Sequence, residues 1–593
     1  MSGIHTNGRR PRVLISSVFA PFHQHENPYE APDNFYQVGV FHRCFTRHQG
    51  MFSILQQQHT YPLHLIAHNL DADVTVLDYP TLSAFGQQVR GGGYDVVAVG
   101  CVVSTLGKAR RMCAVAKQEC PGVVTVVGGP GVLGLGELME PFADHQCRGE
   151  GVAFMRELLG QAPGPIDFPV VRLHHGNDGL LGLPIKDHNF PVLVGLGCPR
   201  RCEFCATSAQ FGGSYQPLFD RGEQLFAFMQ KVERQSRQGR GALSYLSFMV
   251  YDENFLLQRE FVQAFKKLNR EQALKEPQFV IFTFGDADIL SEHSAEDLLE
   301  LGIDTIWVGL ESPTGIGWGK HGDVNLPALV EDMASSGIRV IGSLVAGLDT
   351  QDEAAIRRDM DFALGLPTTA VQYMPVNPIP GTALYERLRA AGRIRDVDHR
   401  WYGMSHYNLL HDSLDEATVL GLIQEFYERE HAAGGPMVYR HLHTRWRGWQ
   451  RHHASANPYV RARTEVFRRD LLRGFPVLVL GERLGPTPQV RALFGDLRRE
   501  VQGAFRSSEV IRQTLKGQLV ADEGLIYTLM GAPGLRLLLR EALVANAVLQ
   551  DPRSRGLSHW LLHRRDAEAR AGQGSIPWGQ PQPVVTNYPR GEA

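Results

Sequence analysis

Three cysteines in one short run constrain this chain more than any other feature. Cys198, Cys202 and Cys205 follow one another with C-x3-C-x2-C spacing. Three thiolates leave a tetrahedral zinc site one ligand short, and each H-x3-H pair that could supply a histidine lies more than 100 residues away. The set better suits a 4Fe-4S cluster, in which three irons each take one thiolate and the fourth stays open for a substrate or cofactor.

The spacing, with Phe204 before the last cysteine, resembles the radical S-adenosylmethionine (SAM) superfamily. The resemblance implies that the open iron chelates SAM, and that an electron from the cluster cleaves the sulfonium to give a 5'-deoxyadenosyl radical. It also implies an external electron donor of the flavodoxin or ferredoxin type. The alternatives are a metal-free group of buried cysteines and a ferredoxin-like carrier, but a carrier normally needs a fourth cysteine and none follows Cys205.

Size and composition restrict the class of protein. With 593 residues the chain is too long for one hydrophobic core, so two or three domains are expected. The net charge of -3 indicates no global attraction to nucleic acid, and no nucleic-acid partner is expected. Residues 1–11 do not resemble a signal peptide, and no run reaches the roughly 18 apolar residues of a membrane span. A cytoplasmic location is therefore expected.

Residues 1–160 alternate short β-branched runs with helical patterns, which indicates a parallel, doubly wound α/β sheet. Ligands of such sheets lie beyond the carboxyl ends of the strands. Glycines at those ends let the backbone approach a bulky ligand closely. The residues expected to bind a cofactor there are Ser104, Thr105, Gly128, Gly129, Gly131, Gly149, Glu150 and Gly151.

The ordered set of these strand ends resembles the Rossmann-like cobalamin-binding domain found ahead of many radical SAM enzymes, so cobalamin is an expected cofactor. The alternative is a flavodoxin-like domain that binds nothing or another nucleotide. The D-x-H-x-x-G motif that supplies a lower axial histidine is missing after the first strand, although His23 and His25 lie in that loop. The resemblance then implies a base-off corrin without a protein ligand. The long loop over residues 22–60 is a candidate cover for the corrin or the substrate.

A Gly- and Pro-rich linker over residues 160–183 is expected to begin a second domain, residues 161–400. After the cysteines, strand-like and helical segments alternate. This order indicates a partial (β/α)6 barrel, as in radical SAM proteins, whose chemistry belongs at the carboxyl ends of the strands. The strands are expected at 243–249, 279–284, 305–310, 340–346 and 371–376.

Several strand ends match the superfamily in order, and the resemblance implies cofactor-binding roles for them. Asp252 is expected near the substrate or the methionine amino group, Glu311 near the ribose or amino group of SAM, and Ser343 and Gly347 near the adenine. On its own, an acidic residue at a strand end is usually a helix cap.

Two further segments bear on the comparison with this family. Residues 377–385 are similar to the Pro-Gly-Thr-x-Leu-Tyr segment common in cobalamin-dependent members. Ala287 stands where an arginine is common before Asp288.

Residues 401–593 are expected to form a mainly helical domain, with apolar periodicity at 417–427 and 535–549 and a disordered tail beyond Pro552. Residues 439–473 mix arginine, histidine and tryptophan. One interpretation is a site for an anionic or amphipathic substrate, or a contact with a membrane surface. The other is a solvated helix face with stacked arginines.

Together these parts resemble a cobalamin-dependent radical SAM methyltransferase that methylates an unactivated carbon of a small natural-product or lipid-like substrate. SAM would then be both the radical source and the methyl donor. Two alternatives stay open. One is a non-methylating relative that performs cyclisation, ring contraction or oxidation, and the other is a cobalamin- or redox-sensing binding protein. No catalytic residue is indicated by the sequence.

Overall fold

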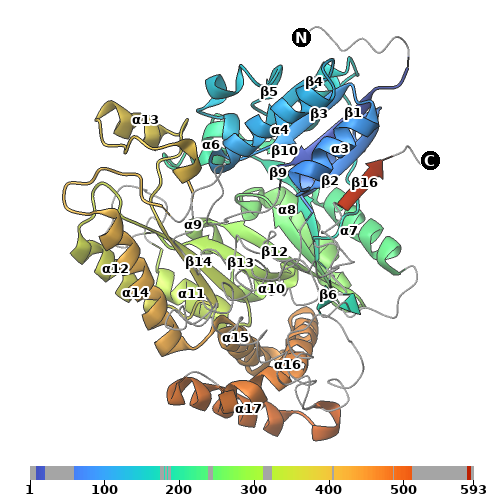
Figure 1. Cartoon of the computed structure of the whole chain (residues 1–593). Coiled ribbons are helices and arrows are strands. Elements are labelled where there is room, and N and C mark those ends of the chain that lie inside the picture. Colours follow the sequence, from blue (N-terminus) through green and yellow to red (C-terminus); the bar gives the residue numbers. More distant parts are fainter. Residues whose placement is uncertain are drawn as a thin grey trace, which may run out of the picture.

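Two parallel sheets and a group of helices make up the described part of the chain (Figure 1). The computed structural model describes residues 9–19, 59–173, 179–180, 183–184, 189–237, 245–311, 324–403, 406–484, 487–510 and 584–588. Most of the predicted loop at 22–60, with His23 and His25, and the predicted helix at 535–549 lie outside these residues.

The first sheet has five parallel strands in the order β2-β1-β3-β4-β5. This is the doubly wound order whose ligands bind where the strand order reverses, between β1 and β3. The strands are β1 (Arg12–Ser17), β2 (Asp73–Asp78), β3 (Val96–Gly100), β4 (Val124–Gly128) and β5 (His145–Cys147).

Helices cover both faces of this sheet because neighbouring strand residues point to opposite sides. Leu14 belongs to a core with the helices on one face, and Val13 and Ile15 to a core on the other. The elements on the first face are α3 (Leu82–Gly92) and α4 (Leu106–Glu119), with the short η1 (Val103–Thr105), η2 (Pro130–Val132) and η3 (Gly136–Met139). The other face carries α2 (Tyr61–His68) and α5 (Gly151–Leu158).

A strand from the far end of the chain extends the first sheet. β16 (Val584–Tyr588) pairs antiparallel with β2, so the prediction of disorder beyond Pro552 is wrong for these residues. Tyr588 is hydrogen-bonded to buried His64 over 2.6 Å, and His64 is hydrogen-bonded to buried Asp78 over 2.7 Å. This polar contact and the β-branched start of the strand explain why the segment is ordered.

The second sheet has six parallel strands in chain order, as a partial (β/α)6 barrel requires. Five of them overlap the predicted strands, so the predicted α/β fold class is confirmed. They are β8 (Asn189–Leu193), β11 (Tyr245–Tyr251), β12 (Gln278–Gly285), β13 (Ile303–Gly309), β14 (Arg339–Ala346) and β15 (Ala370–Pro375).

Helices and short segments connect the barrel strands. The helices between or after the strands are α7 (Gly222–Arg237), α8 (Arg259–Gln272), α9 (Ala287–Leu290), α10 (Ala295–Leu301), α11 (Leu326–Ser335), α12 (Glu353–Leu364), α13 (Ala383–Ala390) and α14 (Glu416–Gly434). The short segments are β6 (Gly179–Leu180), β7 (Leu183–Pro184), β9 (Gly195–Leu196), α6 (Ala206–Gln210), β10 (Gln216–Pro217), η4 (Phe255–Leu257) and η5 (His399–Trp401).

Three helices lie at the bottom of Figure 1: α15 (Met437–His452) and α16 (Pro458–Leu484) contact the barrel, and α17 (Pro488–Ala504) packs on α15 and α16. Arg445 of α15 is 1% exposed, and its guanidinium donates to Asp304 at the start of β13 and to Asp470 of α16. Arg339, the first residue of β14, also donates to Asp304. Burial alone would raise the pKa of Asp304, but Arg339 and Arg445 hold this pKa below its ordinary value.

The arginines of residues 439–473 therefore do not all lie on a solvated helix face, and contact with a substrate or a membrane surface stays a prediction. Arg445 and Arg463 are buried, and Arg463 donates to backbone carbonyls including that of Phe279, over 2.9 Å. Other arginines of this segment also bind protein groups; they are Arg440, Arg447, Arg451, Arg461, Arg468 and Arg469. Their partners lie on Glu430, Glu331, Asp332, Ser455, Glu465, Glu509 and Glu276.

No helix in the described ranges is long and apolar enough to cross a membrane.

The buried arginine gives a test of how the helices stabilise the barrel. Arg445→Ala leaves Asp304 and Asp470 without this partner, and removing one member of a buried ion pair typically costs about 3–5 kcal/mol. We expect a loss of that size in the free energy of unfolding, measured by urea denaturation followed through tryptophan fluorescence. Arg451→Ala is the control, because Arg451 is 42% exposed in its pair with Asp332 and should cost about 1 kcal/mol or less. Equal losses in the two variants would contradict this account.

Candidate functional site

The three cysteines lie on a turn beyond the carboxyl end of β8. Gly197 before the turn has a φ of +81°, and a β-carbon there would lie 2.2 Å from the carbonyl oxygen of Ser214, so this position needs glycine. The N–H of Cys205 donates to the carbonyl of Cys202 over 3.0 Å, and the Ser208 hydroxyl donates to the carbonyl of Cys198 over 3.0 Å. These bonds hold the cysteine backbone in a compact turn.

The electrostatics show that the three thiols are neighbours. Burial first, and then the charges of Asp286, Cys202 and Cys205, raise the pKa of the Cys198 thiol to about 11. A thiol with this pKa stays protonated at neutral pH unless a metal takes the place of the proton. A metal bound by the cysteines of this turn would therefore take the place of the Cys198 proton.

An arginine inside the cysteine run ties the turn to the barrel. Arg200 donates to Asp286 over 2.5 Å and also to Asp288, both just beyond β12. Asn254, which follows β11, donates to the same Asp286 over 2.6 Å. The sequence comparison noted an arginine missing before Asp288, and in the structure Arg200 brings a guanidinium to that carboxylate. Sequence reasoning missed Arg200, although its position between two cluster cysteines is a usable signal.

Asp252 lies at the predicted strand end, but protein groups already bind both of its carboxylate oxygens. The Tyr215 hydroxyl donates to one oxygen over 2.6 Å, and the N–H of Asn254 donates to the other over 2.9 Å. Burial raises the pKa of Asp252 above its ordinary value. A β-carbon on Gly195 would lie 2.0 Å from the hydroxyl oxygen of Tyr215, so this tyrosine packs closely on the strand that leads into the cysteines. The geometry therefore favours a positioning role for Asp252.

Glu311 and Ser343 lie at neighbouring strand ends. Ser343 of β14 is paired in register with Gly309, two residues before Glu311. Glu311 is 8% exposed and has a φ of +49°, a conformation that costs roughly 1–3 kcal/mol for a residue other than glycine. Strain of this kind is typical of functional positions. Cofactor binding by this pair stays a prediction.

Gly347 has a different local reason to be glycine. Its φ is +79°, and a β-carbon would lie 2.7 Å from the ring of Tyr407. The Tyr407 hydroxyl donates to the Gly347 carbonyl over 2.7 Å. This packing accounts for the glycine, whereas contact with an adenine stays a prediction.

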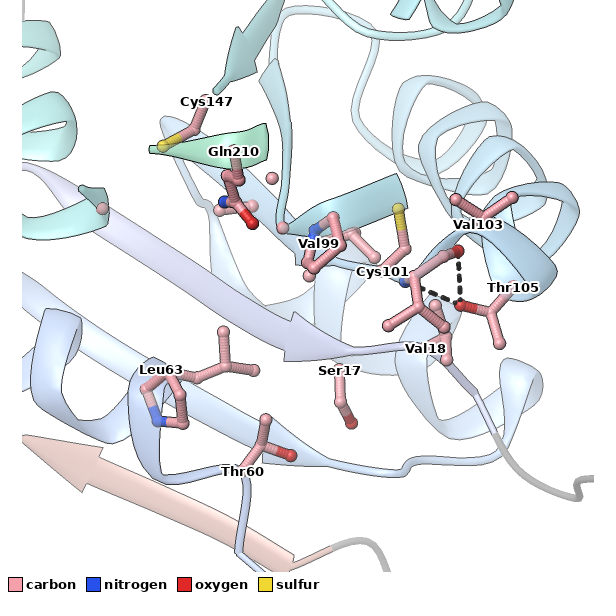
Figure 2. A pocket seen from close by; sticks show the side chains of 18 of the residues that line it. Ser17, Val18, Thr60, Leu63, Val99, Cys101, Val103, Thr105, Cys147 and Gln210 are labelled. Atoms are coloured by element: carbon pink, nitrogen blue, oxygen red, sulfur yellow. Dashed lines mark hydrogen bonds between the residues drawn. The ribbon is translucent and has the colours of Figure 1, made fainter. Parts of the chain in front are cut away.

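A cavity of about 840 Å³ lies beyond the carboxyl ends of β1, β3, β4 and β5 (Figure 2). Ser17 and Thr60 present hydroxyl groups on one side of it, and Cys101 and Thr105 lie on the side of the loop after β3 (Figure 2). Most of the surface that lines the cavity is apolar. Of the residues predicted to bind a cofactor in this region, those that line the cavity are Ser104, Thr105, Gly128, Gly129, Gly149, Glu150 and Gly151.

Gly131 does not line the cavity, and most of the predicted glycines meet protein atoms. A β-carbon on Gly129 or Gly131 would lie 2.6 Å or 2.5 Å from an atom of Cys101. Among the predicted glycines of these turns, Gly149 is the one at which a β-carbon would meet nothing within 4 Å. Gly149 therefore has space for a closely bound ligand, and glycine at Gly129 and Gly131 also lets two loops pack, whereas cofactor binding at these positions stays a prediction.

The polar predicted residues partly serve the backbone. Glu150 caps α5 by accepting from the N–H groups of Val152 and Ala153, each over 2.6 Å. The Thr105 hydroxyl is bonded to the backbone of Val102 over 3.1 Å (Figure 2). These groups shape the wall, and Ser104 lines it without a recorded side-chain bond.

The barrel supplies the opposite part of the lining, which sequence reasoning missed. Gln210 and Phe211 come from α6, directly after the cysteines, and Ile379 comes from the loop after β15. η5 itself adds Arg400, and the segment after η5 adds Tyr402, Gly403 and His406. Apart from Ile379, which lies in the 377–385 segment, these residues belong to no motif, so only the folded chain brings them to the cavity. The first sheet and the cysteine-bearing barrel thus share one cavity.

The cysteine site gives a direct prediction. Anaerobically reconstituted protein should hold close to four irons per chain, because only Cys198, Cys202 and Cys205 combine ligand spacing with a common turn. Replacing all three by alanine should remove the iron and the charge-transfer absorption. Cys120→Ala is the control, since this cysteine lies at the end of α4 in the first sheet. Iron content near eight per chain, or iron lost in the control, would contradict a single cluster.

Comparisons with known proteins agree with this geometry. The model of the Radical SAM superfamily matches residues 192–363. An uncharacterized methyltransferase, PH0819, of Pyrococcus horikoshii is 24% identical over 366 residues, which cover 54% of this chain and 75% of that protein. The cobalamin-dependent radical SAM methyltransferase TokK of Streptomyces tokunonensis is 27% identical over 147 residues, which cover 19% of this chain and 22% of TokK.

The chain is also distantly similar to solved structures. The radical SAM methyltransferase TsrM from Kitasatospora setae, with cobalamin and a [4Fe-4S] cluster bound, has 14% identity and a TM-score of 0.47. The match covers 78% of this chain and 99% of that one. The matched barrel of residues 192–363 contains the three cysteines and the strand ends around them. The match of residues 192–363 to the Radical SAM superfamily implies a 4Fe-4S cluster and SAM as cofactors, as the cysteine spacing predicted.

Proposed function

We propose that this protein is a cobalamin-dependent radical SAM methyltransferase that methylates an unactivated carbon of a small natural-product or lipid-like substrate. The observation that carries the proposal is the shared cavity. Its walls come from the carboxyl ends of the first sheet and from residues next to the cluster cysteines, including Gln210. The names of the two methyltransferase relatives support the same reaction class.

Each cofactor has a matching part of the chain. Cys198, Cys202 and Cys205 would hold the cluster, while Arg200 keeps their turn on the barrel. The residues with a role proposed for SAM are Glu311, Ser343 and Gly347. Those proposed for cobalamin are Ser104, Thr105, Gly128, Gly149, Glu150 and Gly151. When bound, the cofactors supply a carbon-centred radical and a transferable methyl group, which no side chain can supply.

The chain's own residues then have defined tasks. The apolar lining around Leu63 and Val99 excludes water from the shared cavity, which protects a reactive intermediate from side reactions. Asp252 and Tyr215 keep the strand before the cysteines in place. Electrons would come from an external flavodoxin- or ferredoxin-type protein.

The proposal includes a three-part division of the chain. Residues 1–160 would form the cobalamin domain, 161–400 the radical SAM domain, and 401–593 a mainly helical domain. The two separate parallel sheets support the first boundary. The ion pair of Arg445 in α15 with Asp304 in β13, and the hydrogen bond of Arg463 in α16 to the Phe279 carbonyl of β12, indicate that the third part stabilises the barrel.

The coordination of cobalt gives one prediction. We expect the cob(II)alamin form to show no superhyperfine splitting from an axial nitrogen, because the D-x-H-x-x-G motif is missing after β1. Among the described lining residues the one histidine is His406, whose ring is 2% exposed and packs on Trp401 with ring centres 4.7 Å apart. Electron paramagnetic resonance measures the splitting. A nitrogen triplet that disappears in His406→Ala, His23→Ala or His25→Ala would identify a ligand and contradict this expectation.

The reaction itself gives a second prediction. Turnover with SAM bearing a deuterated methyl group should place the deuterated methyl on the product carbon. S-adenosylhomocysteine and 5'-deoxyadenosine should accumulate together, since one SAM molecule is used in each role. Mass spectrometry of product and coproducts measures both. Formation of 5'-deoxyadenosine with an unmethylated, rearranged or oxidised product would select the non-methylating alternative. Absence of SAM cleavage would favour the remaining alternative, a cobalamin- or redox-sensing binding protein.

A further inference from the structure

Two glycine-containing segments, one from each sheet, touch through their backbones at one side of the molecule. Gly134 lies in the loop after β4, and Gly381 lies in the loop after β15. A β-carbon on Gly134 would lie 2.3 Å from the nitrogen of Gly381 and 2.3 Å from the carbonyl carbon of Pro380. Gly381 has a φ of +89°, and a β-carbon there would lie 2.7 Å from Leu133. On the Gly134 side the nearest atoms are all backbone, so no side chain there could move aside.

On the first sheet, this contact is joined to the wall of the cavity. Gly128, Gly129 and Pro130 line the cavity, and Gly134 follows them by a few residues through the single turn of η2. The N–H of Gly131 donates to the carbonyl of Cys101 over 3.0 Å, which fastens this turn to the loop after β3. A shift of Gly134 is therefore transmitted to the cavity wall.

On the barrel, the same contact is joined to the cluster cysteines. Thr382, next to Gly381, caps α13 by accepting from the N–H of Tyr385 over 3.3 Å. The N–H of Leu384 then donates to the carbonyl of Glu203 over 2.9 Å. Arg387 of α13 forms an ion pair with Glu203 over 3.0 Å. Because Glu203 directly follows Cys202, the first turns of α13 are held against the cysteine run.

We propose that the Gly134–Gly381 contact sets the separation between the cavity of the first sheet and the cluster cysteines, which makes Gly134 a positioning residue. The inference rests on the proposed function, because methyl transfer between two cofactor sites needs a fixed separation. Backbone atoms in contact cannot be compressed. A methyl group on Gly134 would have to move by about 1 Å to reach an ordinary van der Waals distance. Misplacement by about 1 Å can lower the rate of a positioned reaction by about 100-fold.

The test compares Gly134→Ala with the wild type and with Gly122→Ala. Gly122 lies between α4 and β4, and a β-carbon there meets nothing within 4 Å, so it is a matched control. Iron and cobalamin contents are measured first, and both should equal the wild-type values. The magnetic interaction between cob(II)alamin and the reduced cluster is then measured by electron paramagnetic resonance. It should weaken in Gly134→Ala alone, because dipolar coupling falls with the cube of distance.

Turnover supplies a second measurement. The ratio of methylated product to 5'-deoxyadenosine should fall by about 100-fold in Gly134→Ala, because SAM cleavage depends on the barrel alone whereas methyl transfer depends on both parts. If Gly134→Ala does not take up its cofactors, Gly381→Ala opens the same contact from the other side and should give the same two changes.

Each other outcome is decisive. Wild-type coupling and an unchanged product ratio in cofactor-loaded Gly134→Ala would overturn the inference, as would equal changes in Gly122→Ala. A wild-type protein that loads both cofactors but never transfers a methyl group would overturn the proposed function, while the coupling measurement still tests the spacing. A wild-type protein that takes up no cobalamin would overturn both.

Discussion

In a parallel sheet every strand ends at the same edge, and the site depends on this constraint. Both sheets place their strand ends toward one cavity, which Ser104 of the first sheet and Gln210 of the barrel line together. Because each edge belongs to a rigid sheet, the relative position of the edges depends on the contacts between the two parts, which include Leu65 and Val152 packed into the barrel core. The contact of Gly134 with Gly381 is another, and on the Gly134 side it is made through backbone atoms.

The two ends of the barrel use charge differently. At the amino end, Arg445 and Asp304 are buried and form an ion pair, so each charge is neutralised by a protein partner. At the carboxyl end, Arg200 binds Asp286 and Asp288 while remaining partly exposed, and the cysteine turn rests on this pair. The fixed charges at the amino end thus stabilise the scaffold, and those at the carboxyl end orient the cluster ligands.

The sequence predicted the features whose cause is local. The strands of both sheets follow from runs of apolar and β-branched residues, and the cluster ligands follow from the spacing of Cys198, Cys202 and Cys205. Features that depend on distant partners were not predictable. The Tyr588 hydroxyl meets His64, which is 524 residues away, and Arg445 meets Asp304, which is 141 residues away. Composition alone therefore suggested a disordered tail and a free cationic surface.

The glycines show why a correct family resemblance can still misplace the role of a residue. Gly129 and Gly131 match the expected turn. A β-carbon at either position would not point into open space but would meet atoms of Cys101 or Val102. Gly149 lines the cavity and a β-carbon there would meet nothing within 4 Å, while Gly134, which the sequence did not single out, excludes a β-carbon because it touches the barrel. A glycine in such a loop thus has three separate causes: packing within one domain, access for a ligand, and contact between domains. Only the neighbours of each missing β-carbon distinguish them, and these neighbours come from parts of the chain far apart in sequence.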